Sequence, residues 1–210
     1  PYAASEDFAL MERVEARDLV AVLDVLASPQ HDLSLAQALR SPLFGASDEA
    51  LIALAQRARG PGSWWTALMA GAEGLLTAHP PLARAAQLLH AWREAADDLP
   101  PHDLLDRIVS EGEYRERVAA AVPREQQLAA LNAIDALLGQ ALMLDGALYA
   151  TPYNFVRALK RRPLTVAAPA QPDAVQLLTV HGAKGLEAKV VFVMDAEPEP
   201  SRSDTATLLV

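Results

Sequence analysis

The stretch Ala174-Val-Gln-Leu-Leu-Thr-Val-His-Gly-Ala-Lys-Gly-Leu-Glu-Ala-Lys-Val-Val-Phe-Val-Met194 predicts a strand, a tight polar turn with one helical turn, and a second strand. The apolar, partly β-branched runs at 175–180 and 189–194 are typical of buried strands. Between them, residues 179–187 concentrate a hydroxyl, an imidazole, two glycines, a cation and a carboxylate. At the edge of a sheet, such a turn offers backbone amides and charged groups to polyanions and nucleotides.

The polar residues of this turn predict contacts with phosphate and ribose. Thr179 and His181 lie two apart at a predicted strand end, so their side chains share one side and could donate to phosphate oxygens. The glycines of Gly182-Ala-Lys-Gly185 allow a tight turn whose backbone comes close to a ligand. Glu187 could accept hydrogen bonds from ribose hydroxyls. A purely structural role, as strand-end or surface residues, is the alternative for each.

Other catalytic patterns find little support in the sequence. The chain has no P-loop, because no Gly is followed four residues later by Gly-Lys-Ser/Thr. The apolar run that ends at Asp195 resembles a Walker B strand, but it has no P-loop partner. Asp48 and Glu49 lie at a predicted helix start, where capping explains them. The five histidines are scattered and predict neither a metal site nor a catalytic triad.

Composition favours a mainly helical domain in a reducing compartment. Hydrophobic residues make up 51% of the 210 positions and charged residues 21%, which excludes a disordered chain. Aromatic residues are only 5%, which suits Ala/Leu-rich helices better than a β-barrel. There is no cysteine, no apolar run of about 20 residues and no signal core, so we expect a cytoplasmic protein without membrane contact.

The charge is acidic overall and uneven. The net charge of −9 is atypical of a free-standing DNA-binding domain, which is more often basic. The segment Thr151–Pro172 is the exception, because it carries four cations, Arg157, Lys160, Arg161 and Arg162, and no carboxylate. This basic segment leads directly into the polar turn. A solvated helix end is an equally plain interpretation.

Helical periodicity predicts a body of helices over residues 27–165. Ser47 is a good N-cap, and Thr151-Pro152 is a strong helix start. Trp64 and Trp65 are better explained as core anchors than as a base-stacking platform. The two ends of the chain are expected to form a small α/β portion. The expected helices span 12–27, 33–39, 48–59, 64–70, 80–96, 104–110, 113–122, 124–144 and 152–160.

The stretch 177–187 resembles the fifth conserved motif of superfamily 1A DNA helicases of the UvrD/RecB kind. Three further segments resemble landmarks of that family in the same order, namely Pro1–Val22, Arg40–Leu51 and Leu104–Tyr114. The second of these is common in the exonuclease V beta (RecB/AddA) branch. The resemblance covers nearly the whole chain and, with the apolar ending at Val210, implies a piece of a longer protein.

The resemblance implies a division of the chain and a function. Residues 1–26 and 173–210 would be parts of the RecA-like domain 2A, and 27–165 the helical 2B subdomain. The fold class is then mainly α, with a small α/β portion from a P-loop helicase domain. The implied protein is an ATP-dependent DNA helicase/exonuclease that unwinds DNA in double-strand-break repair by recombination. It would use ATP and Mg²⁺, whereas the fragment alone would be inactive and bind neither.

The resemblance also implies residue roles and partners. It places Thr179, His181 and Gly182 against DNA, and it places Lys184, Gly185 and Glu187 by the nucleotide. It implies no catalytic residue and no metal ligand within the fragment. The implied partners are single-stranded DNA, a duplex junction and a RecC/AddB-like subunit. The chain departs from the motif where Gly182 replaces a common Ser and Ala188 a common aromatic, and both variants occur in the exonuclease-like branch.

Two other functions are compatible with the residues. A stand-alone helical adaptor or protein-interaction domain would use the glycine turn only as structure. A nucleotide-binding regulatory domain would bind ATP without a partner domain.

Overall fold

The fold is mainly α, as the sequence predicted. The computed structural model describes residues 2–4, 8–58, 64–71, 74–143, 151–161, 164–166 and 175–194. The described helices are α1 (Val14–Ala27), α2 (Asp32–Arg40), α3 (Asp48–Arg57), α4 (Trp64–Met69), α5 (Leu75–Ala78), α6 (Pro80–Ala95), α7 (Pro101–Glu111), α8 (Tyr114–Ala121), α9 (Arg124–Met143) and α10 (Pro152–Arg161), with a 3-10 turn, η1 (Leu10–Glu12), before α1. The strands are β1 (Tyr2–Ala4), β2 (Phe8–Ala9), β3 (Thr165–Val166) and β4 (Val175–Leu177).

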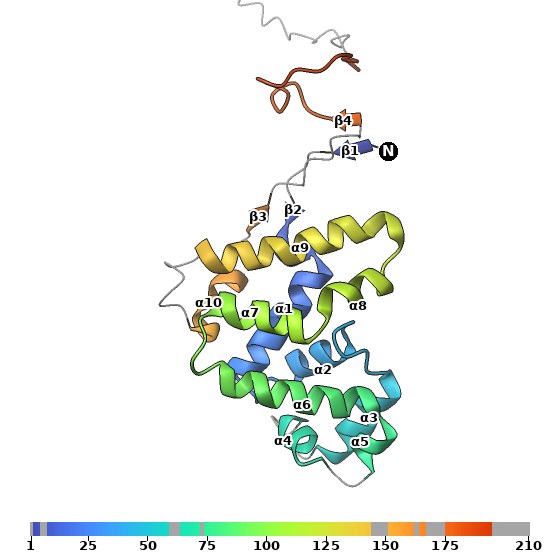
Figure 1. The fold of residues 1–210 in the computed structure, drawn as a ribbon, viewed down its shortest axis with the longest axis vertical. Coiled ribbons are helices and arrows are strands. Elements are labelled where there is room, and N and C mark those ends of the chain that lie inside the picture. Colours follow the sequence, from blue (N-terminus) through green and yellow to red (C-terminus); the bar gives the residue numbers. More distant parts are fainter. Residues whose placement is uncertain are drawn as a thin grey trace, which may run out of the picture.

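Helix α1 forms the centre of the helical body and contacts α2, α6, α9 and α10 (Figure 1). From Ala16 to Leu26 every residue except Arg17 is buried. A helix that is apolar on nearly all sides needs neighbours on all sides, which explains its central place. Val14, which we expected on the buried side, is 53% exposed because it opens the helix. Two carboxylates, Asp18 and Asp24, are buried along α1 and need partners.

Local capping signals set several helix starts. The Ser47 hydroxyl accepts from the Ala50 N–H (3.2 Å), as the sequence predicted for α3. The Thr151 hydroxyl likewise accepts from the Asn154 N–H (3.2 Å) at the start of α10. Asp32 was expected to cap α2, but it is the first residue of that helix. Its carboxylate accepts from the Trp64 N–H (3.1 Å) and so joins the start of α4 to α2.

The layer formed by α6 and α7 is fixed by side chains that cross between elements. Arg84 of α6 donates to the Leu43 carbonyl (2.6 Å) and to the Gly112 carbonyl (2.9 Å) at the end of α7. A Cβ on Gly112 would collide with the Ile108 carbonyl oxygen and the Leu43 side chain, so only glycine fits there. Trp64 and Trp65 are partly buried against the core, which confirms them as anchors.

Two short strand pairs bring the ends of the chain together, as predicted. β1 pairs in parallel with β4, with Tyr2 opposite Val175, and β2 pairs antiparallel with β3, with Phe8 opposite Val166. Figure 1 shows both pairs on one side of the helical body, with residues 178–194 beyond them.

The prediction of two buried strands in the 174–194 stretch was wrong. β4 ends at Leu177 and its three residues are exposed, and residues 189–194 form no strand. A strand becomes buried only when it has neighbours on both edges and cover on both faces. Among the described residues, β4 pairs only with β1. The apolar composition therefore indicates burial that the described part of the chain does not provide.

Candidate functional site

The polar turn folds locally, as its sequence predicted. The Ala183 N–H donates to the Thr179 carbonyl (2.9 Å), and the Leu186 N–H donates to the Ala183 carbonyl (3.0 Å), which closes a single helical turn. Gly185 then takes a φ of +85°, a left-handed conformation that a residue with a Cβ adopts only with strain. The second glycine is therefore required by the backbone, independently of any ligand.

Thr179 has a structural task inside the turn. Its hydroxyl oxygen accepts from the Gly182 N–H at 3.1 Å. A Cβ on Gly182 would lie 3.2 Å from the same oxygen, so a side chain there would displace the hydroxyl by a few tenths of an ångström. The oxygen accepts this bond while its own hydrogen remains able to donate to a ligand. The expected DNA contact and the turn-forming contact are thus compatible.

The remaining polar side chains of the turn are exposed. His181, Lys184 and Glu187 all face solvent. Within the described residues, none of these three side chains forms a hydrogen bond or an ion pair. An imidazole, an ammonium and a carboxylate are thus available for ligands on one short turn. Their roles remain predictions, and Asp195, the residue after the apolar run, lies outside the described residues.

An exposed apolar run follows the turn. Phe192 is 86% exposed and Met194 83%, and Val190, Val191 and Val193 are about as open. Contiguous apolar side chains on a protein surface mark places that contact something else. The polar turn therefore lies beside a segment whose composition favours cover by another structural layer.

A second polar cluster, which the sequence did not reveal, surrounds Asp18 on α1. Gln37 donates to one carboxylate oxygen (3.2 Å), and the Tyr114 hydroxyl lies 3.4 Å from the other. A cavity of about 380 Å³ opens beside it, lined by Val14, Arg17, Asp18, Gln37, Arg40, Ser41 and Pro42. Tyr114 is 96 positions away from Asp18 in sequence, so only the fold brings them together.

Burial raises the pKa of Asp18 to about 6, although the hydrogen bonds from Gln37 and Tyr114 oppose the rise. Because this pKa exceeds its ordinary value of 3.8, the folded state holds the proton more tightly than the unfolded state. Folding is therefore favoured as the pH falls from about 7 toward 4. We expect this group to make the chain about 1 kcal/mol more stable near pH 5 than near pH 7.

Urea unfolding of wild type and Asp18→Asn, at both pH values, measures this effect. The amide cannot titrate but keeps an oxygen to accept from Gln37. The stability difference between the two proteins should therefore change by about 1 kcal/mol across this pH range. A difference that stays constant with pH would show that Asp18 does not titrate there.

Further searches of the described residues give two findings. They contain no group of three or more His, Cys, Asp or Glu side chains that could hold a metal ion. None of their helices is long and apolar enough to cross a bilayer.

Comparison with known proteins gives the chain a set of relatives. No family model matches it. Over 195 residues, 87% of the chain, it is 30% identical to the ATP-dependent helicase/nuclease subunit of the AddA type from Bacillus cereus (strain B4264). The chain is related to these helicase/nuclease subunits. The same-named proteins of Bacillus cytotoxicus and Enterococcus faecalis are 30% identical over 194 residues and 28% over 205.

These relatives confirm the resemblance to UvrD/RecB-like helicases of the AddA/RecB branch. The similarity extends over 87 to 92% of the chain, so it includes the helical body. The chain spans only 15 to 16% of the length of the relatives.

Proposed function

We propose that the chain is one segment of an ATP-dependent DNA helicase/nuclease, in which the turn at 179–187 lies between nucleotide and DNA. The observation that carries this is the exposed, locally ordered turn with its free imidazole, ammonium and carboxylate. Residues 1–26 and 173–210 would belong to the RecA-like domain 2A, and 27–165 to the helical 2B subdomain. The names of the relatives support the same class of activity.

The N-terminal half of the turn would contact DNA. An imidazole N–H of His181 and the hydroxyl hydrogen of Thr179 can both donate to phosphate oxygens of a strand. Gly182 would let that strand approach the backbone closely. Such contacts carry no base preference, which suits a motor that moves along any sequence.

The C-terminal half of the turn would contact the nucleotide. Glu187 can accept from the two ribose hydroxyls, and Lys184 supplies a point charge for phosphates. Gly185 keeps the backbone open between them. These donors and acceptors fit one side of an ATP site, while a P-loop to hold the phosphates and Mg²⁺ is absent from the chain. ATP with Mg²⁺ would bind only in the full-length protein, so the 210-residue chain alone should release no phosphate from ATP.

The exposed apolar run would be covered in the full-length protein. Residues 190–194 have the composition of a central strand of a parallel sheet, which is apolar on both faces. Further strands of domain 2A would supply that cover. We place the protein in the cytoplasm, in DNA unwinding and recombinational double-strand-break repair, with an AddB/RecC-like partner subunit.

Single substitutions in the full-length protein test the proposal. His181→Ala and Glu187→Ala should each reduce ATP-driven unwinding of a duplex at least tenfold, because loss of one aligned charged or hydrogen-bonding contact costs about 1.4 kcal/mol or more. Lys189→Ala, an exposed cation in the same segment with no assigned role, is the matched control. Unwinding is followed by strand displacement, and circular dichroism checks that the fold is retained.

The two halves of the turn should fail differently. Glu187→Ala should raise the ATP concentration needed for half-maximal hydrolysis, whereas His181→Ala should mainly weaken the stimulation of hydrolysis by single-stranded DNA. Unwinding by both variants at the level of Lys189→Ala would remove the assignment of the turn to the motor.

A further inference from the structure

Helix α10 has two sharply different faces. Pro152, Phe155, Val156 and Leu159 are buried against the body, where α10 contacts α1. At 100° per residue, the exposed side chains fall on one continuous arc of the opposite face. These are Tyr153, Asn154, Arg157, Lys160 and Arg161. The arc carries cations, hydrogen-bond donors and one aromatic ring, and no carboxylate.

The arginines of this face differ from most arginines of the helical body. Elsewhere guanidinium groups lie against carboxylates, as Arg93 does with Asp97 (2.9 Å) and Arg115 with Asp135 (2.6 Å). Within the described residues, Arg157 and Arg161 have no such partner. In a chain of net charge −9, two unpaired cations one helical turn apart form a local exception.

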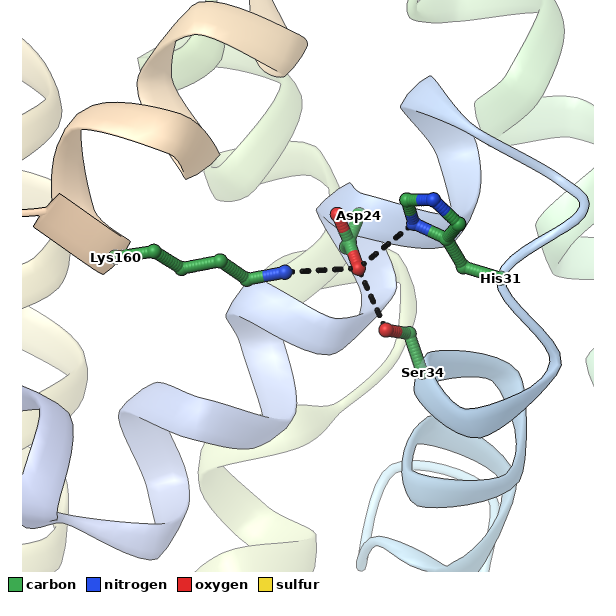
Figure 2. A network of polar contacts seen from close by, with 4 residues as sticks. All are labelled: Asp24, His31, Ser34 and Lys160. Atoms are coloured by element: carbon green, nitrogen blue, oxygen red, sulfur yellow. Dashed lines mark hydrogen bonds and ion pairs between the residues drawn. The ribbon is translucent and has the colours of Figure 1, made fainter.

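The fold holds this face in place through Lys160. Its ammonium lies 3.0 Å from the buried carboxylate of Asp24 on α1, which also accepts from Ser34 (Figure 2). Lys160 is thereby committed to the body, while Arg157 and Arg161 remain available. The helix is thus fixed with its arginines outward and cannot neutralise them by rotating toward Asp24.

Tyr153 adds an aromatic ring to the basic arc. Its side chain is 51% exposed. Tyr153 and Arg157 are four residues apart and therefore neighbours on the helix surface. Guanidinium groups that hold phosphates beside a ring that stacks on a base are the combination that binds single strands without sequence preference.

We propose that the exposed face of α10, formed by Tyr153, Arg157 and Arg161, is a second single-stranded DNA contact, separate from the turn at 179–187. The choice of DNA rests on the proposed function. The two arginines would each contact one phosphate and the tyrosine would stack on an unpaired base. Since α10 precedes the turn in the chain, one strand could contact both surfaces in succession.

Fluorescence anisotropy of the 210-residue chain with a labelled oligothymidine tests the proposal, at roughly 50 mM salt, where phosphate contacts are strongest. We expect Arg157→Ala/Arg161→Ala to weaken binding at least tenfold. It should also lower the slope of log K against log salt by about 1.4, since each phosphate contact on a single strand contributes about 0.7. Tyr153→Ala should weaken binding about fivefold or more, whereas Tyr153→Phe keeps the stacking ring and should bind like wild type.

The matched control is Arg57→Ala/Arg124→Ala, which removes the same charge from two exposed arginines outside α10 that have no carboxylate partner among the described residues. It should change binding less than twofold. Equal losses in both double variants would overturn the proposal in favour of a non-specific charge effect. Absence of binding by wild type, or tighter binding to the matching duplex, would overturn it as well.

These outcomes are independent of the test of the proposed function. Loss of binding on α10, with unwinding unaffected by His181→Ala, would keep the α10 surface and remove the motor assignment. Unchanged binding on α10, with unwinding lost in His181→Ala, would do the reverse.

Discussion

Replacing Trp92 with alanine is expected to lower the free energy of unfolding by about 4 kcal/mol, in the range found for buried aromatic residues. Trp92 lies on α6, is fully buried, and packs its ring 6.1 Å from that of Phe44. Its indole N–H donates to Glu111 on α7 (2.7 Å). Alanine would leave a cavity between these elements and remove the donor to Glu111. Urea unfolding followed by circular dichroism measures the loss.

Two controls separate the contributions at this site. Trp92→Phe keeps most of the apolar contact and loses the donor, so it should cost less than the alanine variant. Leu33→Ala, on an α2 position that is 85% exposed, should change stability by less than about 0.5 kcal/mol. A Trp92→Ala loss as small as that of Leu33→Ala would mean that α6 and α7 do not share the core that this structure shows.

Local signals in the sequence were enough to predict most helices. The predicted starts of α3, α4, α6 and α9 coincide with those in the structure, because caps, prolines and glycines act on neighbouring backbone groups. The four-residue helix α5 was missed, since Gly74 and Leu75 give no periodic pattern in so short a segment. The pair β2–β3 was missed for a different reason, because two-residue strands form only where the fold brings them together.

The buried side of α9 was predicted only in part. Leu128 and Leu142 were expected inward but are 49% and 55% exposed, whereas Ile134 and Leu138 are buried as expected. Alanines at 130, 133 and 141 are buried instead. An Ala/Leu-rich helix has more than one apolar stripe, and small residues face the core where another helix approaches closely. Only the arrangement of α1, α7 and α8 around α9 selects the stripe.

The candidate site shows the same division between local and distant information. The turn at 179–187 was predicted because its hydrogen bonds join residues three and four positions apart. The burial of its flanking strands was not correctly predicted, since burial depends on neighbours elsewhere in the chain. The partners of Asp24 could not be predicted at all, because Lys160 is 136 positions away in sequence.

Asp24 is expected to contribute a second large effect on stability. Its carboxylate oxygen Oδ2 accepts from Ser34 (2.6 Å) and Lys160 (3.0 Å), and His31 Nδ1 lies 3.1 Å away (Figure 2). Burial alone would raise the pKa of Asp24, but the hydrogen bonds from Ser34, Lys160 and His31 and the charge of Lys160 lower it overall. The ionised carboxylate therefore stabilises the folded state above its ordinary pKa, and this contribution is lost in acid as the group is protonated.

We expect Asp24→Ala to lower the free energy of unfolding by about 2 to 3 kcal/mol near pH 7, because charge-assisted hydrogen bonds at a buried acceptor are lost together. Lys160 is half exposed and can return to water, which limits the loss. Asp24→Asn, which keeps an oxygen but no charge, should lose less. Asp97→Ala, which removes an exposed partner of Arg93, should cost at most about 0.5 kcal/mol. If urea unfolding gave Asp24→Ala no larger loss than Asp97→Ala, α10 would be held to α1 by its apolar face alone.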